Sequence, residues 1–271
     1  MIATSANTRP PAVAGSFYPA FPEELAAEVR SLLADAPAAT GPIPKAIIAP
    51  HAGYVYSGPT AAAIYARLAP ARERIRRVVL LGPVHRVAVR GLALPAADRF
   101  ATPLGHVALD VDAMNAIVNM PQVCVSAAAH AHEHSLEVHL PFLQTVLVDF
   151  TLVPLAVGDT SAGEVAEVLE RLWGGDETLI VVSSDLSHFL GYADAQSVDR
   201  QTTAKILALR DDISHSEACG GTPVNGLALA ARRHGLAPSL VDLRNSGDAA
   251  RGAGDKRRVV GYGAFAYTAT A

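Results

Sequence analysis

The chain has 271 residues, half of them hydrophobic, and a formal net charge of −4 at pH 7. This allows one large globular domain with a substantial core, and no block of like charge indicates a nucleic-acid or membrane-surface partner. No apolar run reaches the roughly 18 residues of a membrane-spanning helix, and the first residues lack a secretion signal. The two cysteines, Cys124 and Cys219, are too few for a disulfide framework. We therefore expect a cytoplasmic protein.

A short amphipathic helix is expected first, at 23–35, before the Pro/Gly-rich stretch 37–44. Apolar runs without polar alternation then predict buried parallel strands, at 46–49, 77–82, 151–158 and 178–184. Helical patterns occur between these runs, at 58–69, 135–147, 163–173, 199–210 and 224–235. Residues 91–95 and 105–110 indicate shorter strands or a hairpin, and 258–269 a closing strand whose glycines allow close approach.

Strands that alternate with helices predict an α/β fold with helices on both faces of a sheet. We expect a single three-layer αβα domain with a mixed, largely parallel central sheet. It spans residues 1–271, of which about 10–268 are expected to be structured. No change in composition requires a second domain.

Chemically useful side chains follow three of the predicted strands. His51 comes just after the strand at 46–49, His85 follows the strand at 77–82, and Asp185 and His188 follow the strand at 178–184. Ligands of open α/β sheets bind outside the carboxyl ends of the strands, so these side chains are expected to meet in one cleft. Imidazole and carboxylate are common ligands of divalent metals. A single histidine at such a position more often caps a helix or packs in a loop, and the case for a metal depends on the convergence of all three.

Cys219 lies in a glycine turn directly before a predicted helix whose first turn contains Pro223. The N-terminus of a helix favours a thiolate, which is both a metal ligand and a nucleophile. The alternative is a buried apolar thiol, and Cys124, which lies in an apolar run, fits that alternative better.

The stretch HAHEHSLEVHL at 130–140 has four histidines, yet their density does not make it a metal site. His134 and His139 are five residues apart, so on a helix they point to different sides. His139 flanks an apolar stripe and is expected to be partly buried, whereas His130 and His132 are treated as surface residues. Glu133 and His134 lie at the start of the predicted helix, where a capping role competes with a functional one.

Several long motifs in this order resemble the Memo family, the Memo-like protein B of the AmmeMemoRadiSam system. The matching stretches are AGSFYPA, IIAPHAGYVYSG, LLGPVHR, EHSLEVHLPF, VVSSDLSHF and CGGTPV. They cover nearly the whole chain. The family is similar in fold to the non-haem iron class III extradiol dioxygenases.

The resemblance implies a metal centre and names its residues. His51, His85 and Cys219 would be iron ligands, and His134, Asp185 and His188 would line the same cleft as catalytic groups. The extradiol enzymes bind iron through two histidines and a glutamate, and no clear counterpart of that glutamate is found. In the GPVHR motif, Arg86 takes a position where Memo proteins can carry a second histidine.

Three functions follow as hypotheses. The first is an iron-dependent oxidoreductase, in which His188 is the general acid or base and Asp185 orients it or supports a ligand histidine. The second is a module without turnover that binds a peptide or protein, with the AMMECR-like and radical-SAM components of the same system as expected partners. The third is a zinc hydrolase that uses the same ligands. Zinc and copper are the alternatives to iron.

Overall fold

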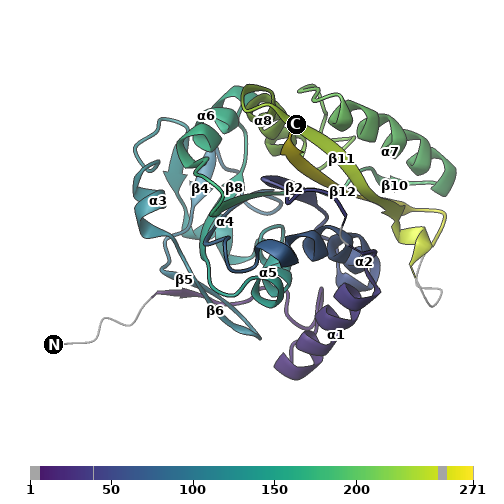
Figure 1. Cartoon of the computed structure of the whole chain (residues 1–271), viewed down its shortest axis with the longest axis horizontal. Coiled ribbons are helices and arrows are strands. Elements are labelled where there is room, and N and C mark those ends of the chain that lie inside the picture. Colours follow the sequence, from purple (N-terminus) through teal and green to yellow (C-terminus); the bar gives the residue numbers. More distant parts are fainter. Residues whose placement is uncertain (1–6, 39, 250–254, 271) are drawn as a thin grey trace.

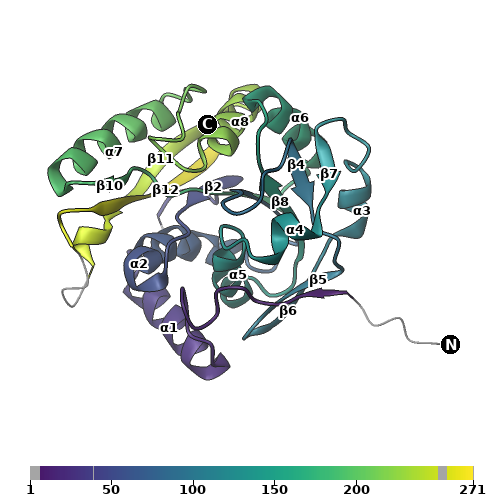
Figure 2. The same cartoon turned by 180° about the vertical axis from the view of Figure 1, so that it is seen from behind.

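A computed structural model describes residues 7–38, 40–249 and 255–270. One nine-stranded mixed sheet forms its centre, and helices cover both faces of that sheet (Figures 1 and 2). This arrangement confirms the expected three-layer αβα domain. Among the described residues, no helix is long and apolar enough to cross a membrane.

Four parallel strands make up the middle of the sheet, in the order β2 (Ala46–Ala49), β9 (Thr178–Ser183), β3 (Arg77–Pro83) and β8 (Thr151–Val157). These are the four predicted apolar runs. Antiparallel strands flank them on both sides: β4 (Leu92–Leu94), which also pairs with β7 (Val123–Val125), next to β8, and β12 (Val259–Ala269) next to β2. Strands β10 (His188–Leu190) and β11 (Leu236–Asn245) both pair with β12.

Alternate residues of the central strands enter two separate cores, one on each face of the sheet. Ile47 and Val78 pack with helices α1 (Pro22–Asp35), α2 (Tyr54–Tyr65) and α5 (Leu140–Val146). Their neighbours Ile48 and Val79 pack on the other face, with helices α6 (Ala162–Leu172), α7 (Tyr192–Leu207) and α8 (Gly221–Arg233). Burial on both faces explains why these strands show no polar alternation in the sequence.

Short elements connect the layers. A small second sheet contains β1 (Thr8–Arg9), β5 (Arg99–Thr102) and β6 (Gly105–Ala108), so the segments predicted at 91–95 and 105–110 lie in different sheets. The remaining turns are α3 (Val111–Asn115), α4 (Ala127–Ala131) and three 3₁₀ helices, η1 (Ala66–Ala71), η2 (Glu137–His139) and η3 (Ser246–Asp248). The helix predicted at 135–147 is thus divided into η2 and α5, with Pro141 in the first turn of α5.

The closing strand β12 uses a glycine where the prediction expected one. A Cβ on Gly261 would lie 2.1 Å from Oδ2 of the buried Asp199, a distance that no side chain could occupy. Asp199 in turn accepts a hydrogen bond of 3.0 Å from the amide of Ser187. The close approach therefore lets α7 support the loop that joins β9 to β10.

The N-terminal segment is attached to the start of η2 by a buried ion pair. Arg9 and Glu137 form this pair in the core, where their side chains are 5% and 0% exposed. The Arg9 guanidinium also donates to the carbonyl oxygens of His130 and Glu133, at 2.9 and 2.6 Å. Glu137 accepts hydrogen bonds from the amides of Ala12 and Val13. One arginine thus fixes the loop that carries His134.

The prediction that His130 is a surface residue is wrong. Its side chain is buried, and the ring Nε2 bonds to the carbonyl oxygen of Ala93 at 2.8 Å. Burial lowers the pKa of His130 to about 4. His132 is exposed, as expected, and His139 is fully buried beside the Tyr65 hydroxyl, 2.9 Å from its Nδ1.

His130 should make the protein sensitive to mild acid. Its pKa is lower in the folded than in the unfolded chain, so the folded state binds fewer protons and stability falls as pH decreases from about 6.5 to about 4. The loss should approach about 1.4 kcal/mol per pH unit within this window. Urea unfolding at pH 7.5, 6 and 5 measures it. His130→Gln, which keeps a donor for Ala93, should show a shallower dependence, and identical slopes would contradict the assignment.

Candidate metal centre

The candidate site lies at the carboxyl edge of the parallel strands. His51 follows the end of β2, His85 follows β3, and Asp185 follows β9, which lies between the other two strands. The convergence predicted from the strand ends is therefore present. It follows from strand order, because β9 lies directly between β2 and β3, and the carboxyl ends of these three parallel strands meet at one edge of the sheet.

Three histidines meet at this edge. Atoms of His51, His85 and His134 that could ligate a metal all lie within 4.8 Å of one another. The ring centroids are 5.3 Å apart for His51 and His85, 5.5 Å for His51 and His134, and 4.6 Å for His85 and His134. We call these three residues the histidine cluster. It could hold a metal ion.

Hydrogen bonds determine the tautomer of His51. The Ser183 hydroxyl donates its proton to the carbonyl oxygen of Ser135 at 2.6 Å. It therefore accepts from Nδ1–H of His51, which lies 2.6 Å away. This assigns the proton to Nδ1 and leaves Nε2 unprotonated. Burial holds the pKa of His51 well below its usual range, so the ring is neutral.

His85 is oriented in the same way by Glu133. Its Nδ1 lies 2.8 Å from Glu133 Oε1, and its amide donates to Oε2 at 2.6 Å. A carboxylate that accepts from one ring nitrogen fixes the tautomer and makes the other nitrogen a better ligand. The Nε2 atom of His85 is thus left for a metal.

Glu133 is a buried carboxylate that remains ionised. Burial alone would raise its pKa, but the His85 ring and the backbone amides of His85 and Ser135 lower the pKa to about 2. Its Oε1 also accepts from the amides of His134 and Ser135, both at 2.9 Å. The sequence left both a capping role and a functional role open for Glu133; in the structure it accepts hydrogen bonds from the ring and amide of His85 and from the amides of His134 and Ser135.

His134 has the strongest structural indication of a missing partner. Its Nδ1 is buried and makes no hydrogen bond within the described part of the chain, although Glu133 Oε1 lies 3.4 Å away. Burial lowers the pKa of His134 to about 4, so this ring is also neutral at pH 7. A buried, neutral nitrogen without a partner is costly unless something binds it. The donor set therefore fits a metal ion.

Cys219 lies beside the cluster. Its Sγ is 3.4 Å from Nε2 of His51 and accepts from the amide of Asp185 at 3.3 Å. The expectation that the helix N-terminus favours a thiolate is not met, because burial and the nearby Asp185 raise the pKa of Cys219 to about 12. A metal ion would reverse this preference, since a coordinating thiol loses its proton. Cys124 is half-buried in β7.

Asp185 and His188 approach from the loop after β9. Asp185 does not contact His188; its Oδ1 accepts from the amide of His51 at 2.8 Å, so it supports a residue of the cluster. Burial raises the pKa of Asp185 to about 7. The Nδ1–H of His188 donates to the carbonyl oxygen of Leu186 at 2.8 Å, which leaves Nε2 free.

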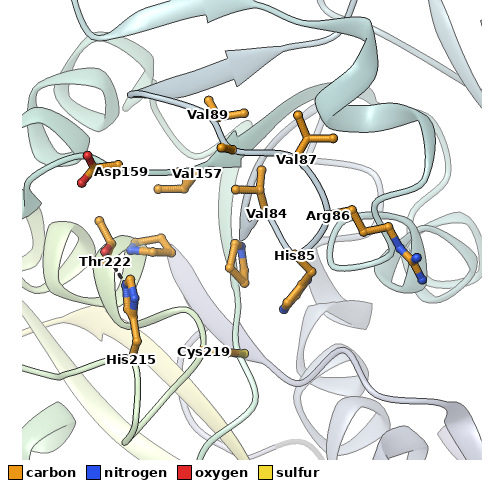
Figure 3. Close-up of a pocket in the computed structure, with 14 residues that line it drawn as sticks. Val84, His85, Arg86, Val87, Val89, Val157, Asp159, His215, Cys219 and Thr222 are labelled. Carbon is orange, nitrogen blue, oxygen red and sulfur yellow. Dashed lines mark hydrogen bonds between the residues drawn. The ribbon is translucent and has the colours of Figure 1, made fainter.

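Two cavities are lined by residues of this site. One, of about 580 Å³, contains His85 and Cys219 between an apolar wall of valines and a polar wall with His215, Thr222 and Asp159 (Figure 3). The other, of about 370 Å³, is lined by His134, Asp185 and His188. Figure 3 also shows Arg86 directed away from His85 and Cys219. Five of the six residues predicted for the site thus line one cavity or the other, whereas the buried His51 lines neither.

Residues 130–134 also spell His-x-x-Glu-His, a pattern in which two metal ligands share one helix. Helix α4 ends at Ala131, so no helix joins His130 to His134. The His130 ring is instead bound to Ala93, while His134 joins the cluster. Only one histidine of this pattern can take part.

Glu133→Gln should weaken metal binding by about 10- to 100-fold, the usual effect of losing a carboxylate behind a ligand histidine. Four N–H groups donate to the Glu133 carboxylate. The side-chain amide of glutamine would place its own N–H donors among them, so the His85 ring would lose the acceptor that fixes its orientation. Metal competition with a chromophoric chelator measures the change. Glu167→Gln, a carboxylate far from the cluster that accepts from Gln122 at 3.0 Å, is the control. Equal affinities for both variants would contradict the role of Glu133.

The chain matches a known protein family over almost its whole length. The family model described as Memo-like protein matches residues 9–266. The chain belongs to the Memo family. It is 36% identical to a MEMO1 family protein of Aquifex aeolicus, over 94% of this chain and 97% of the relative. It is also 36% identical to one of Archaeoglobus fulgidus, over 96% of this chain and 99% of the relative.

A solved structure supports the fold of this Memo family member. An uncharacterized protein of Escherichia coli K12 matches with a TM-score of 0.50 and 14% identity, over 80% of this chain and 98% of that one. At this identity the similarity concerns the fold alone. The family model and the relatives at 36% identity confirm, at the level of the family, the resemblance seen in the sequence motifs.

Proposed function

We propose that this Memo family protein binds one Fe²⁺ ion at the histidine cluster and uses it in the oxygen-dependent oxidation of a small molecule. The observation that carries the proposal is the convergence of three imidazole rings, whose possible ligand atoms all lie within 4.8 Å of one another. The Nδ1 atom of His51 is hydrogen-bonded to Ser183, and the Nδ1 atom of His85 is hydrogen-bonded to Glu133. Such fixed tautomers are typical of metal ligands.

Cys219 is proposed as an additional ligand. The set implied by the family motifs was His51, His85 and Cys219, and the cluster adds His134 to it. The Cys219 sulfur lies 3.4 Å from Nε2 of His51, so one ion could contact both after small shifts. Thiolate and imidazole together favour iron, copper or zinc over magnesium or calcium.

The protein's own groups supply proton transfer beside the cluster. A bound Fe²⁺ would supply electrons for reaction with O₂. The pKa of Asp185, raised to about 7 by burial, suits a group that exchanges a proton near neutrality. His188 presents an unprotonated Nε2 from the opposite end of the same loop. The smaller cavity, lined by both groups, would keep the substrate within their reach.

A zinc-dependent hydrolase is the second candidate. Three histidines with no carboxylate ligand are one known donor set of catalytic zinc. Zn²⁺ would supply Lewis acidity, and Asp185 would again act as the general base. The two candidates share their residues and differ in the ion.

Metal content distinguishes them. The chain is expressed with equal concentrations of Fe²⁺, Zn²⁺, Cu²⁺ and Mn²⁺, purified without oxygen, and analysed for each metal. The proposal expects about one equivalent of iron, the stoichiometry of a single site, and oxygen consumption with at least one member of a panel of phenols and thiols. One equivalent of zinc would support the hydrolase. Metal binding with no turnover of either kind would favour the peptide- or protein-binding module, and absence of all metals would refute the centre.

A further inference from the structure

An arginine without an acidic partner faces the smaller cavity. Arg258 lines this cavity together with His134 and His188, and its guanidinium lies 5.0 Å from the centre of the Phe189 ring. It forms no ion pair with any carboxylate of the described residues. The residues outside the described ranges contain no Asp or Glu. The five N–H donors of this guanidinium therefore have no acidic side chain to bind.

One carboxylate that lines the cavity is already engaged. Asp255 lines the same cavity, but it binds the neighbouring Arg257 through Nε at 3.0 Å and Nη2 at 2.9 Å, and also accepts from the Arg257 amide. Its charge is therefore neutralised by a bidentate contact. Of the two adjacent arginines, one is paired and the other is left facing the cavity.

The backbone beneath Arg258 is held in an unusual conformation. Phe189 has a φ of 61°, in the left-handed region that phenylalanine rarely adopts, and its side chain is 61% exposed. Strained residues of this kind are concentrated at functional sites. The exposed Phe189 ring lies beneath the guanidinium, and its centroid is 5.7 Å from that of the His188 ring. The arginine is thus supported at the rim of the cavity.

The cavity offers an apolar surface and one further donor. Phe17 and Tyr262 line it, and the Phe17 ring also contacts His134, with centroids 4.8 Å apart. The Tyr56 hydroxyl has no hydrogen-bond partner within the described part of the chain, and this residue is 38% exposed. A small molecule could place a flat or aliphatic body against Phe17 and a charged end toward Arg258 and Tyr56.

We infer that the smaller cavity binds a small organic monocarboxylate, with Arg258 as the residue that recognises the carboxylate and orients the molecule toward His134 and His188. Guanidinium is the side chain that best matches a carboxylate. A monoanion fits better than a dianion, because Arg258 is the only lysine or arginine among the described residues that line this cavity. The inference rests on the proposed function, since it names the class of substrate for the same centre.

The test uses benzoate as the probe and benzamide as its neutral counterpart of similar shape. Ligand-detected NMR titrations measure Kd for both, with the purified protein and with the protein after treatment with a chelator. Wild type should prefer benzoate by about tenfold, the effect of one charge-assisted contact. Arg258→Gln should lose this preference, and Arg258→Lys should keep part of it. Lys256→Gln is the control: it removes one charge two residues away, at a side chain that lies over Tyr192.

Each outcome decides the inference. Equal affinities of the wild type for benzoate and benzamide would overturn it. An equal loss of the benzoate preference in Arg258→Gln and Lys256→Gln would also overturn it, because the preference would then come from the overall positive charge of this region and not from a contact with Arg258. Phenyl phosphate that binds more tightly than benzoate would overturn the monocarboxylate assignment. Metal content is measured in the same samples. A preference that persists in a protein without metal uptake supports the subsite and refutes the metal centre, whereas normal metal uptake without the preference refutes only the subsite.

Discussion

Replacing His51 by Asn should reduce the metal content from about one equivalent to a small fraction, with at least about a 100-fold loss of affinity, more than the loss of a supporting residue causes. The amide nitrogen of Asn can take the place of Nδ1 and keep the hydrogen bond to Ser183, now 2.6 Å. The variant lacks only the nitrogen that faces the cluster. Elemental analysis after anaerobic purification measures the result.

The matched control is His132→Asn. His132 is exposed, and it lies in the histidine-rich stretch two residues before His134. It should leave the metal content unchanged, because no atom of it belongs to the cluster. A full equivalent of metal bound to the His51→Asn variant would contradict the proposal that the histidine cluster is the metal site. Circular dichroism of both variants checks that the fold is retained.

Replacing Arg9 by Met should lower the free energy of unfolding by about 3 to 5 kcal/mol, the cost of leaving a buried charge without its partner. Glu137 is fully buried and would remain with no cation beside it. The carbonyl oxygens of His130 and Glu133 would lose their donor as well. Urea denaturation followed by circular dichroism measures the change.

An arginine in an exposed ion pair provides the comparison for Arg9. Arg76 and Asp149 are paired at 3.4 Å, with side chains 52% and 82% exposed. Arg76→Met should change stability by less than about 1 kcal/mol, since exposed pairs contribute little. If both arginine variants had the same small effect, the buried pair would not be the attachment of the N-terminal segment that the contacts indicate.

The central strands could be predicted because burial on both faces leaves a direct record in the sequence. Strands β2, β3, β8 and β9 are continuous apolar runs, and their ends placed His51, His85 and Asp185 at one edge. Strand β11 was missed. Most of its residues are exposed or half-buried and it contains Pro238, so neither an apolar run nor a regular alternation marks it.

The position of His134 could be predicted only in part. The motif resemblance placed it in the cleft, but its approach to the other histidines depends on the loop at 130–137, which Arg9 and Glu133 hold by hydrogen bonds to the backbone. Such contacts between distant segments have no periodicity in the sequence. The error at His130 has the same origin, because its burial depends on the Ala93 carbonyl oxygen on β4. The assumption that a histidine in a connecting segment is exposed fails where contacts with a distant strand bury that segment.

Strand order has a consequence for when the proposed metal ion could bind. His51, His85 and His134 all precede β9, which begins at Thr178, yet β9 is the strand that lies between β2 and β3 and sets their separation. A nascent chain that ends before β9 contains all three histidines and lacks the scaffold that spaces them. Domains fold as units once enough of the chain has emerged from the ribosome. We therefore expect metal uptake to follow insertion of β9, so that a loaded centre marks a chain whose sheet is already complete.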